Sequence, residues 1–168
     1  MSLIDIPAVL PHRHPMLLVD EVLHLVEGQE LTARKAIALD RPGYYVDLPE
    51  NAGLAGCAYP PALLLESWCQ AAGILATAHQ PSPDVRVGRV MLVTSVSHVR
   101  ACGDVLPGDV IEHRVRVLRA FDEAMTFEGE TVTGDGRRVL EVERVVMTMR
   151  PAASLRRVEQ HQETFDDE

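Results

Sequence analysis

The sequence predicts an α+β domain in which a curled antiparallel sheet wraps around one long central helix. Two strand-like segments come before a single helix near residues 60–77, and four strand-like segments follow it. Several of these strands alternate polar and apolar residues, which indicates that one face of the sheet meets solvent. Because one helix can cover a six-stranded sheet only when the sheet curls around it, the order of elements favours this architecture.

The N-terminal part of the chain predicts a short helix and a hairpin. The apolar stretch 3–10 can form a helix that Pro11 ends. Residues 16–26 are apolar and predict a strand, and residues 31–39 alternate with a period near two, which predicts its hairpin partner. Residues 40–59 contain proline and glycine throughout and predict a long loop, which in a compact domain is usually functional or disordered.

The rest of the chain predicts the central helix and a run of strands. The helix begins at Pro60 and Pro61, where proline is favourable because the missing N–H would have no partner in the first turn. Turn sequences rich in proline, glycine and aspartate then separate four strand candidates, at residues 88–100, 110–119, 124–132 and 138–149. Since the outer strands of such a sheet need pairing or protection, we expect a dimer with a continuous sheet.

Length and composition narrow the class of protein. The 168 residues predict one domain, 1–150, followed by an acidic tail, 151–168, which has few apolar residues and predicts disorder. The net charge of −9 argues against nucleic acid as a partner. No apolar run is long enough to span a membrane, and residues 1–7 do not resemble a secretion signal. Three cysteines without C-x-x-C spacing indicate thiols in a reducing cytoplasm and no metal site.

The predicted helix carries one acid among apolar residues. Glu66 follows three leucines and precedes Trp68, and Gln70 lies four residues further on the same helical face. Apolar surroundings raise the pKa of a carboxyl group, which suits an acid that donates a proton near neutral pH. The alternative is an acid near a helix start that the helix dipole stabilises and that solvent reaches.

Four segments of the chain carry a set of motifs in a fixed order. They are L-P-H-R-H-P-M-L-L-V-D at 10–20, L-L-E-S-W-C-Q-A-A-G-I-L at 64–75, V-L-P-G-D at 105–109 and F-E-G at 127–129. These resemble L-P-H-R-Y-P-F-L-L-V-D, I-I-E-A-M-A-Q-A-A-G-I-L, V-V-P-G-D and K-F-E-G of the FabZ-type 3-hydroxyacyl-[acyl carrier protein] dehydratases. The resemblance covers about residues 10–150 and implies the hotdog fold of that family.

The resemblance also implies a reaction. In that family a loop histidine removes the α-proton of a 3-hydroxyacyl thioester, and the helix acid, donated from the other subunit, protonates the leaving hydroxyl. A backbone N–H at the start of the helix binds the thioester oxygen. The acyl chain is carried on the phosphopantetheine of an acyl carrier protein, and no other cofactor is implied. The implied setting is a bacterial fatty-acid or polyketide pathway.

The chain keeps the family's acid, at Glu66, and departs from the family at two other positions. Asp47 stands where the histidine is expected, and Pro61, which has no N–H to donate, stands where the family has glycine. The loop between Asp47 and Glu66 is also longer than in the family. Glu66 and Asp47 are therefore the catalytic candidates, and the substrate-binding candidates are Gln70, Tyr59, Pro61 and Arg100.

Several roles stay open at these positions. Arg100 matches an arginine of the family and is expected either to contact the carrier protein or to form a surface ion pair. His12 and His14 flank Arg13 in a turn bounded by prolines, and they are interpreted as hydrogen-bonding turn residues rather than bases, with an approach of either to the pocket as the alternative.

Three classes of function follow from the resemblance and the departures. The first is a dehydratase component that pairs with a histidine-bearing homologue as a heterodimer, or with itself as a homodimer. The second is a hotdog thioesterase in which Glu66 activates water or attacks the thioester. The third is a structural or acyl-binding subunit without catalysis.

Overall fold

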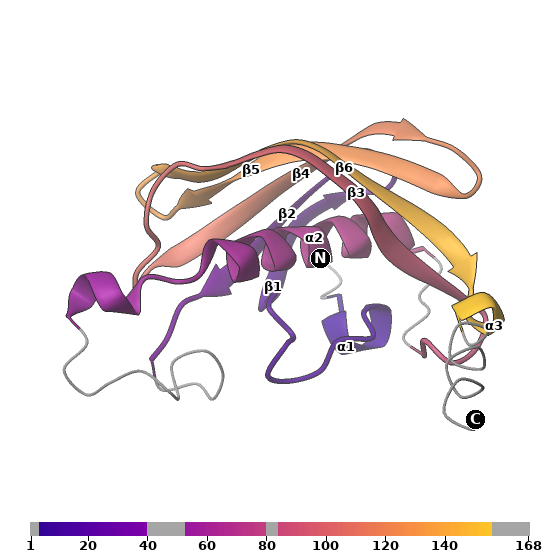
Figure 1. Cartoon of the computed structure of the whole chain (residues 1–168), viewed down its shortest axis with the longest axis horizontal. Helices are drawn as coiled ribbons and strands as arrows, with labels where there is room; N and C mark the ends of the chain where they lie inside the picture. Colours follow the sequence, from indigo (N-terminus) through magenta and orange to yellow (C-terminus); the bar gives the residue numbers. More distant parts are fainter. Residues whose placement is uncertain (1–3, 40–52, 80–83, 156–168) are drawn as a thin grey trace, which may run out of the picture.

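The computed structural model describes residues 4–39, 53–79 and 84–155, and within them one antiparallel sheet curls around a central helix, α2 (Pro61–Thr77) (Figure 1). The strands are β1 (Glu21–Val26), β2 (Glu30–Ala36), β3 (Arg89–Ala101), β4 (Val110–Ala120), β5 (Ala124–Thr133) and β6 (Arg138–Pro151). They lie in the order β1-β2-β4-β5-β6-β3. The predicted α+β architecture is confirmed.

Strand β3 lies at the far edge of the sheet from β1. It pairs with β6, the last strand, and not with β4, which follows it in the sequence. Strands β4, β5 and β6 are joined as consecutive antiparallel pairs. The predicted hairpin of β1 and β2 is also confirmed, with Val26 opposite Glu30 at its closed end. In the described sheet, β1 and β3 each have a neighbour on one side.

The first strand is shorter than the sequence predicted. Residues 16–20 do not extend β1; they pass over α2 before the strand begins at Glu21. Their apolar character reflects contact with the helix, and the backbone groups of Met16 and Leu18 bond to side chains of α2. A strand partner is therefore not needed to satisfy this backbone.

Three short helical segments complete the described structure. Helix α1 (Ile6–Val9) is shorter than the predicted 3–10, and a 3₁₀ turn (Leu54–Cys57) lies within the predicted loop 40–59. Helix α3 (Ala152–Leu155) follows β6 directly. Within the described ranges, none of the helices has the combination of length and apolar character required to span a bilayer.

The start of the predicted tail needs correction. Pro151 is still part of β6, and Ala152 is buried and donates its backbone N–H to the carbonyl of Gly88 at 2.9 Å. This contact fixes the chain beyond the predicted boundary at 151. Residues 156–168 lie outside the described residues, so the disordered acidic tail stays a prediction there.

The core lies between α2 and the concave face of the sheet. From Ser67 to Thr77 every residue of α2 is buried, because the sheet covers one side and α1 with the segment after it covers another. Leu10 packs directly against the helix, since a Cβ on Gly73 would lie 3.5 Å from Leu10 Cδ2, an ordinary van der Waals distance. Each large apolar side chain that is fully buried here, such as Trp68 and Phe127, stabilises the fold by about 1.5–3 kcal/mol.

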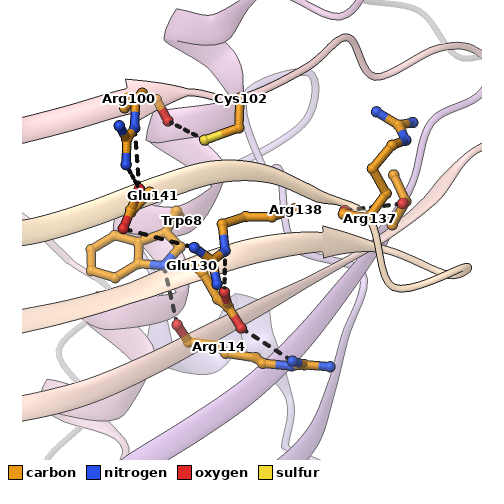
Figure 2. Close-up of polar contacts among 9 residues, drawn as sticks. Trp68, Arg100, Cys102, Arg114, Glu130, Arg137, Arg138 and Glu141 are labelled. Carbon is orange, nitrogen blue, oxygen red and sulfur yellow. Dashed lines mark hydrogen bonds and ion pairs between the residues drawn. The ribbon is translucent and has the colours of Figure 1, made fainter.

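Trp68 fixes the position of the helix against the sheet. Its indole N–H donates to the backbone carbonyl of Arg114 in β4 at 3.3 Å, as Figure 2 shows. Gly129 in β5 makes room for this contact because it has no side chain; its φ is +154°, and the pairing of β5 with β6 is irregular at this point. A Cβ on Gly129 would lie 1.9 Å from the Arg114 carbonyl oxygen and 3.3 Å from the indole ring.

The outer, solvated face of the sheet carries a ladder of ion pairs across β4, β5, β6 and β3. Glu130 contacts Arg114 at 3.1 Å and Arg138 at 2.7 Å, and Glu141 contacts Arg138 at 3.8 Å (Figure 2). At the edge strand, Arg100 Nε donates to the same Glu141 at 3.2 Å. Because solvent reaches these side chains and screens their charges, the ladder adds little to the stability of the fold.

We expect the Gly129→Ala substitution to destabilise the protein strongly. The added methyl group has no space beside the Arg114 carbonyl, so strand β4 or β5 must move, at an expected cost of about 3 kcal/mol. The Gly134→Ala variant is the matched control, since its Cβ would lie 3.7 Å from the nearest backbone oxygen. Thermal and urea unfolding of the two variants measure the difference, and equal stabilities would contradict the role of Gly129.

Candidate functional site

A pocket of about 210 Å³ lies between the turn after α1, the middle of α2 and strands β3 and β6. His12 and Gln70 both contact Glu66 and form the polar end of the pocket with this acid, and Thr77 and Arg89 are further polar residues of the lining. The rest of its wall is mainly apolar and includes Val9, Leu10, Val90, Met91, Met147 and Met149. A pocket with a few polar groups at one end and an apolar wall suits a ligand with a polar head and an apolar chain.

Glu66 lies in the N-terminal half of α2 with its carboxylate facing the polar end of the pocket. Gln70 Nε2 donates to Glu66 Oε1 at 2.9 Å, and His12 Nε2 lies 3.4 Å from the same oxygen. The helical spacing of four residues brings Gln70 to Glu66, as the sequence predicted. The Glu66 side chain is 36% exposed, so solvent reaches it from the pocket side.

The predicted rise in the pKa of Glu66 is wrong. The hydrogen bond with His12 is the largest influence and holds this pKa below its ordinary value of 4.5. Burial acts in the opposite direction, and the hydrogen bond from Gln70 lowers the pKa further. The sequence showed the apolar neighbours along the helix but not the two polar groups that contact the carboxylate. At neutral pH the structure therefore favours Glu66 as a carboxylate.

Gln70 is buried, with 2% of its surface exposed, and its amide is fully used by the protein. Its Oε1 accepts from the backbone N–H of Leu18 at 2.8 Å, and its Nε2 donates to the Met16 carbonyl at 2.8 Å as well as to Glu66. Both amide hydrogens are thus committed. Gln70 lines the pocket as predicted from the resemblance, and its contacts hold the N-terminal segment across the helix.

A second polar chain runs beneath this segment, from Leu18 through Ser67 and His113 to Thr131. Ser67 Oγ donates to the Leu18 carbonyl at 2.6 Å and lies 2.7 Å from His113 Nε2, and His113 Nδ1 lies 2.9 Å from Thr131 Oγ1. Because the single hydroxyl hydrogen of Ser67 goes to the carbonyl, His113 Nε2 must donate to Ser67 and Nδ1 must accept from Thr131. Burial lowers the pKa of His113 to about 3, so the ring is neutral.

The other predicted site residues lie elsewhere. Tyr59 is buried and donates its backbone N–H to the Val105 carbonyl at 2.7 Å, and Pro61 is the exposed first residue of α2. Arg100 lies in the ion-pair ladder on the outer face of the sheet, which matches the surface alternative. None of these three lines the described pocket. Asp47 lies outside the described residues.

His12 lies in the pocket, which was the alternative to its interpretation as a hydrogen-bonding turn residue. Its ring lies against Glu66, whereas His14 does not line this pocket. The position of His12 follows from the apolar stretch 16–19, because its contact with α2 brings the preceding turn to the helix. Since that contact depends on side chains far away in the sequence, no local sequence pattern predicts it.

A six-stranded sheet curled around one helix, with a helix acid at the polar end of an apolar pocket, defines the chain as a hotdog-fold protein. Residues 10–143 match the family model of the FabA-like domain. The chain is 34% identical over 155 residues to the 3-hydroxyacyl-[acyl-carrier-protein] dehydratase FabZ of Oleidesulfovibrio alaskensis, and the alignment covers 88% of this chain and 93% of that protein. The chain therefore belongs to the FabZ-type dehydratase family.

Solved structures show the same fold at lower sequence identity. The dehydratase heterocomplex ApeI:P from Xenorhabdus doucetiae superposes with a TM-score of 0.75 at 18% identity, covering 94% of this chain and 98% of that chain. A thioesterase-superfamily member from Thermus thermophilus gives a TM-score of 0.59 at 17% identity, covering 84% and 98%. At these identities the likeness concerns the fold alone.

We expect the stability of the protein to fall as the pH is lowered from about 6.5 toward about 3, in part because of His113. The unfolded chain binds a proton at this histidine near pH 6.5, whereas the folded chain does so only near pH 3, so acid favours unfolding. The contribution is at most about 1.4 kcal/mol per pH unit in this range.

The variant His113→Gln tests this expectation, because glutamine keeps a donor for Ser67 but does not titrate. Urea unfolding between pH 4 and 7 should show a shallower pH dependence for His113→Gln than for the wild type. The variant His24→Gln, at an exposed histidine, is the control and should keep the wild-type slope. If His113→Gln does not fold, NMR titration of the wild type tests the expectation instead. A His113 ring that titrates above pH 5 would contradict it.

Proposed function

We propose that this chain is a dehydratase component that converts 3-hydroxyacyl thioesters on acyl carrier protein to trans-2-enoyl thioesters. The observation that carries the proposal is the position of Glu66, at the polar end of a mainly apolar pocket in a FabZ-type fold. The thioester and the hydroxyl would lie near Glu66, and the acyl chain would lie along the apolar wall formed by Met91, Met147 and Met149. The phosphopantetheine of the carrier presents the substrate, and the reaction needs no other cofactor.

In this proposal Glu66 delivers a proton to the leaving hydroxyl while a base removes the α-proton. General acid–base catalysis of this kind typically contributes about 10²–10⁴ in rate. Asp47 occupies the family's base position, and an ordinary carboxylate is a weak base for an α-proton. The family's oxyanion donor is also absent, because Pro61 has no N–H. A partner subunit that supplies the histidine would restore the base.

The edge strand β3 is the surface that supports such a partner. It pairs with β6 along one side, and its other side faces no strand in the described sheet. Val93 and Val96 are 47% and 43% exposed along this strand. An unpaired edge with exposed valines suits strand pairing with a second subunit. We propose a heterodimer with a histidine-bearing homologue, in a fatty-acid or polyketide pathway, with a homodimer as the alternative.

Thioester hydrolysis is the second candidate function, and the charge of Glu66 favours it. The contacts with His12 and Gln70 lower the pKa of Glu66, and a carboxylate can activate water or attack the thioester carbon directly. Hydrolysis would not require the histidine that this chain lacks. A purely structural or acyl-binding subunit would show neither reaction.

Intact-mass analysis of a 3-hydroxyacyl carrier protein distinguishes these functions. The purified chain is incubated with it alone, and again with a histidine-containing homologue encoded beside it. Loss of water with the chain alone would mean that this chain supplies its own base, and loss only with the homologue would show the heterodimer. Release of free carrier thiol would instead show a thioesterase.

We expect Glu66→Gln to reduce dehydration by about 100-fold or more, because the amide cannot deliver the proton. The matched control is Glu30→Gln, since Glu30 contacts His24 at 3.4 Å on the exposed β1–β2 hairpin and lies away from the pocket. This control should keep the wild-type rate. An unchanged rate of dehydration in Glu66→Gln would mean that this chain has only a structural role.

A further inference from the structure

The pocket contains two titratable side chains in direct contact, His12 from the turn after α1 and Glu66 from α2. Their Nε2 and Oε1 atoms are 3.4 Å apart, and each side chain is about one third exposed toward the pocket. The other ring nitrogen, His12 Nδ1, is buried and has no hydrogen-bond partner within the described residues. The polar contact of the ring is therefore the one with Glu66.

The backbone holds His12 in this position from several sides. Arg13 Nη1 donates to the carbonyls of Leu10 and His12 at 2.8 and 2.7 Å, which fixes the turn. Leu10 is buried against α2, and the segment after the turn is bonded to Gln70 and Ser67. Both the turn and the helix are thus fixed on either side of the His12–Glu66 contact.

We propose that His12 is the proton partner of Glu66: the pair holds one proton, which passes from His12 through Glu66 to the leaving hydroxyl and is then replaced from solvent. This inference rests on the proposed dehydration. It gives His12 a positioning role that acts through Glu66, and it does not depend on whether Asp47 or a partner's histidine takes the α-proton.

The steps balance over one turnover. The base takes the α-proton, the electron pair of that C–H bond forms the C=C bond, and the C–O bond breaks. The proton of the pair moves from the His12 imidazolium to the Glu66 carboxylate and from there to the leaving oxygen, and water leaves. The base then returns the α-proton to solvent, and the exposed part of the neutral His12 ring regains a proton from solvent.

The charges around the pair agree with this role. The contact with His12 lowers the pKa of Glu66, so the carboxylate seldom holds the proton at neutral pH, and the neighbouring imidazole provides a second place for that proton. Cys69, the other titratable group on the same stretch of helix, is held as a thiol because burial raises its pKa to about 12. Arg13 is bonded to backbone carbonyls, and Arg89 of β3, which also lines the pocket, pairs with Glu123 at 2.9 Å.

The variant His12→Gln tests the inference through the pH dependence of dehydration. Glutamine can still donate an N–H to Glu66, but it cannot supply a proton. The high-pH limb of the rate profile should move down by about one unit or more, because a lone carboxyl loses its proton at lower pH than an imidazole. At pH 8 the rate should fall by about 10-fold or more, and the deficit should shrink as the pH is lowered.

The control is His24→Gln on the exposed hairpin. It removes a histidine–glutamate contact of the same length, 3.4 Å, outside the pocket and should leave the pH profile unchanged. A His12→Gln enzyme with the wild-type profile would overturn the inference. A uniform loss of rate at every pH would also overturn it, because that result indicates a structural effect.

NMR titration of the Glu66 carboxyl group provides a readout that needs no substrate. This group should titrate at higher pH in His12→Ala than in the wild type, because the variant removes the hydrogen bond that lowers the pKa of Glu66. An unchanged titration would overturn the inference even if His12→Gln failed to fold. If the wild type dehydrates nothing, with or without a partner, the proposed function fails together with the role of His12. If it dehydrates and only the His12 results are negative, the proposed function stands.

Discussion

The hydrogen bonds of Gln70 are the constraint on which the rest of the structure depends. A side-chain amide buried inside a helix–sheet core is costly unless its donors and acceptor are satisfied. The curled sheet covers the opposite side of the helix, so the N-terminal segment supplies the partners through Met16 and Leu18. Ser67 adds a third bond to the same segment. These contacts determine where the chain passes before it enters the sheet.

The path of that segment in turn creates the site. It forms one wall of the pocket and brings the turn at His12 against the carboxylate of Glu66. The remaining amide hydrogen of Gln70 goes to the same carboxylate, so one side chain both anchors the segment and holds the acid. The structural and chemical roles of this stretch of α2 cannot be separated, because replacing Gln70 would disturb the wall and the carboxylate together.

The architecture could be predicted from the sequence because alternation and turn residues are local signals. Strands β3 to β6 and helix α2 lie close to their predicted bounds for this reason. Residues 16–20 were assigned to a strand because their apolar character does not reveal whether a sheet or a helix receives them. The pKa of Glu66 was expected to rise because the neighbours along a helix are visible in the sequence, whereas contacts from the turn at His12 depend on the tertiary fold. The position of Asp47 stays a prediction.

The contact between Trp68 and the sheet allows the packing of the core to be followed by tryptophan fluorescence. Trp68 is the only tryptophan of the chain, and it is fully buried where the central helix meets β4 and β5. Its fluorescence therefore reports on this one junction and needs no label. Emission from a dry, hydrogen-bonded indole differs from that of an indole in water, so separation of helix and sheet would be seen directly as a shift of the emission to longer wavelength.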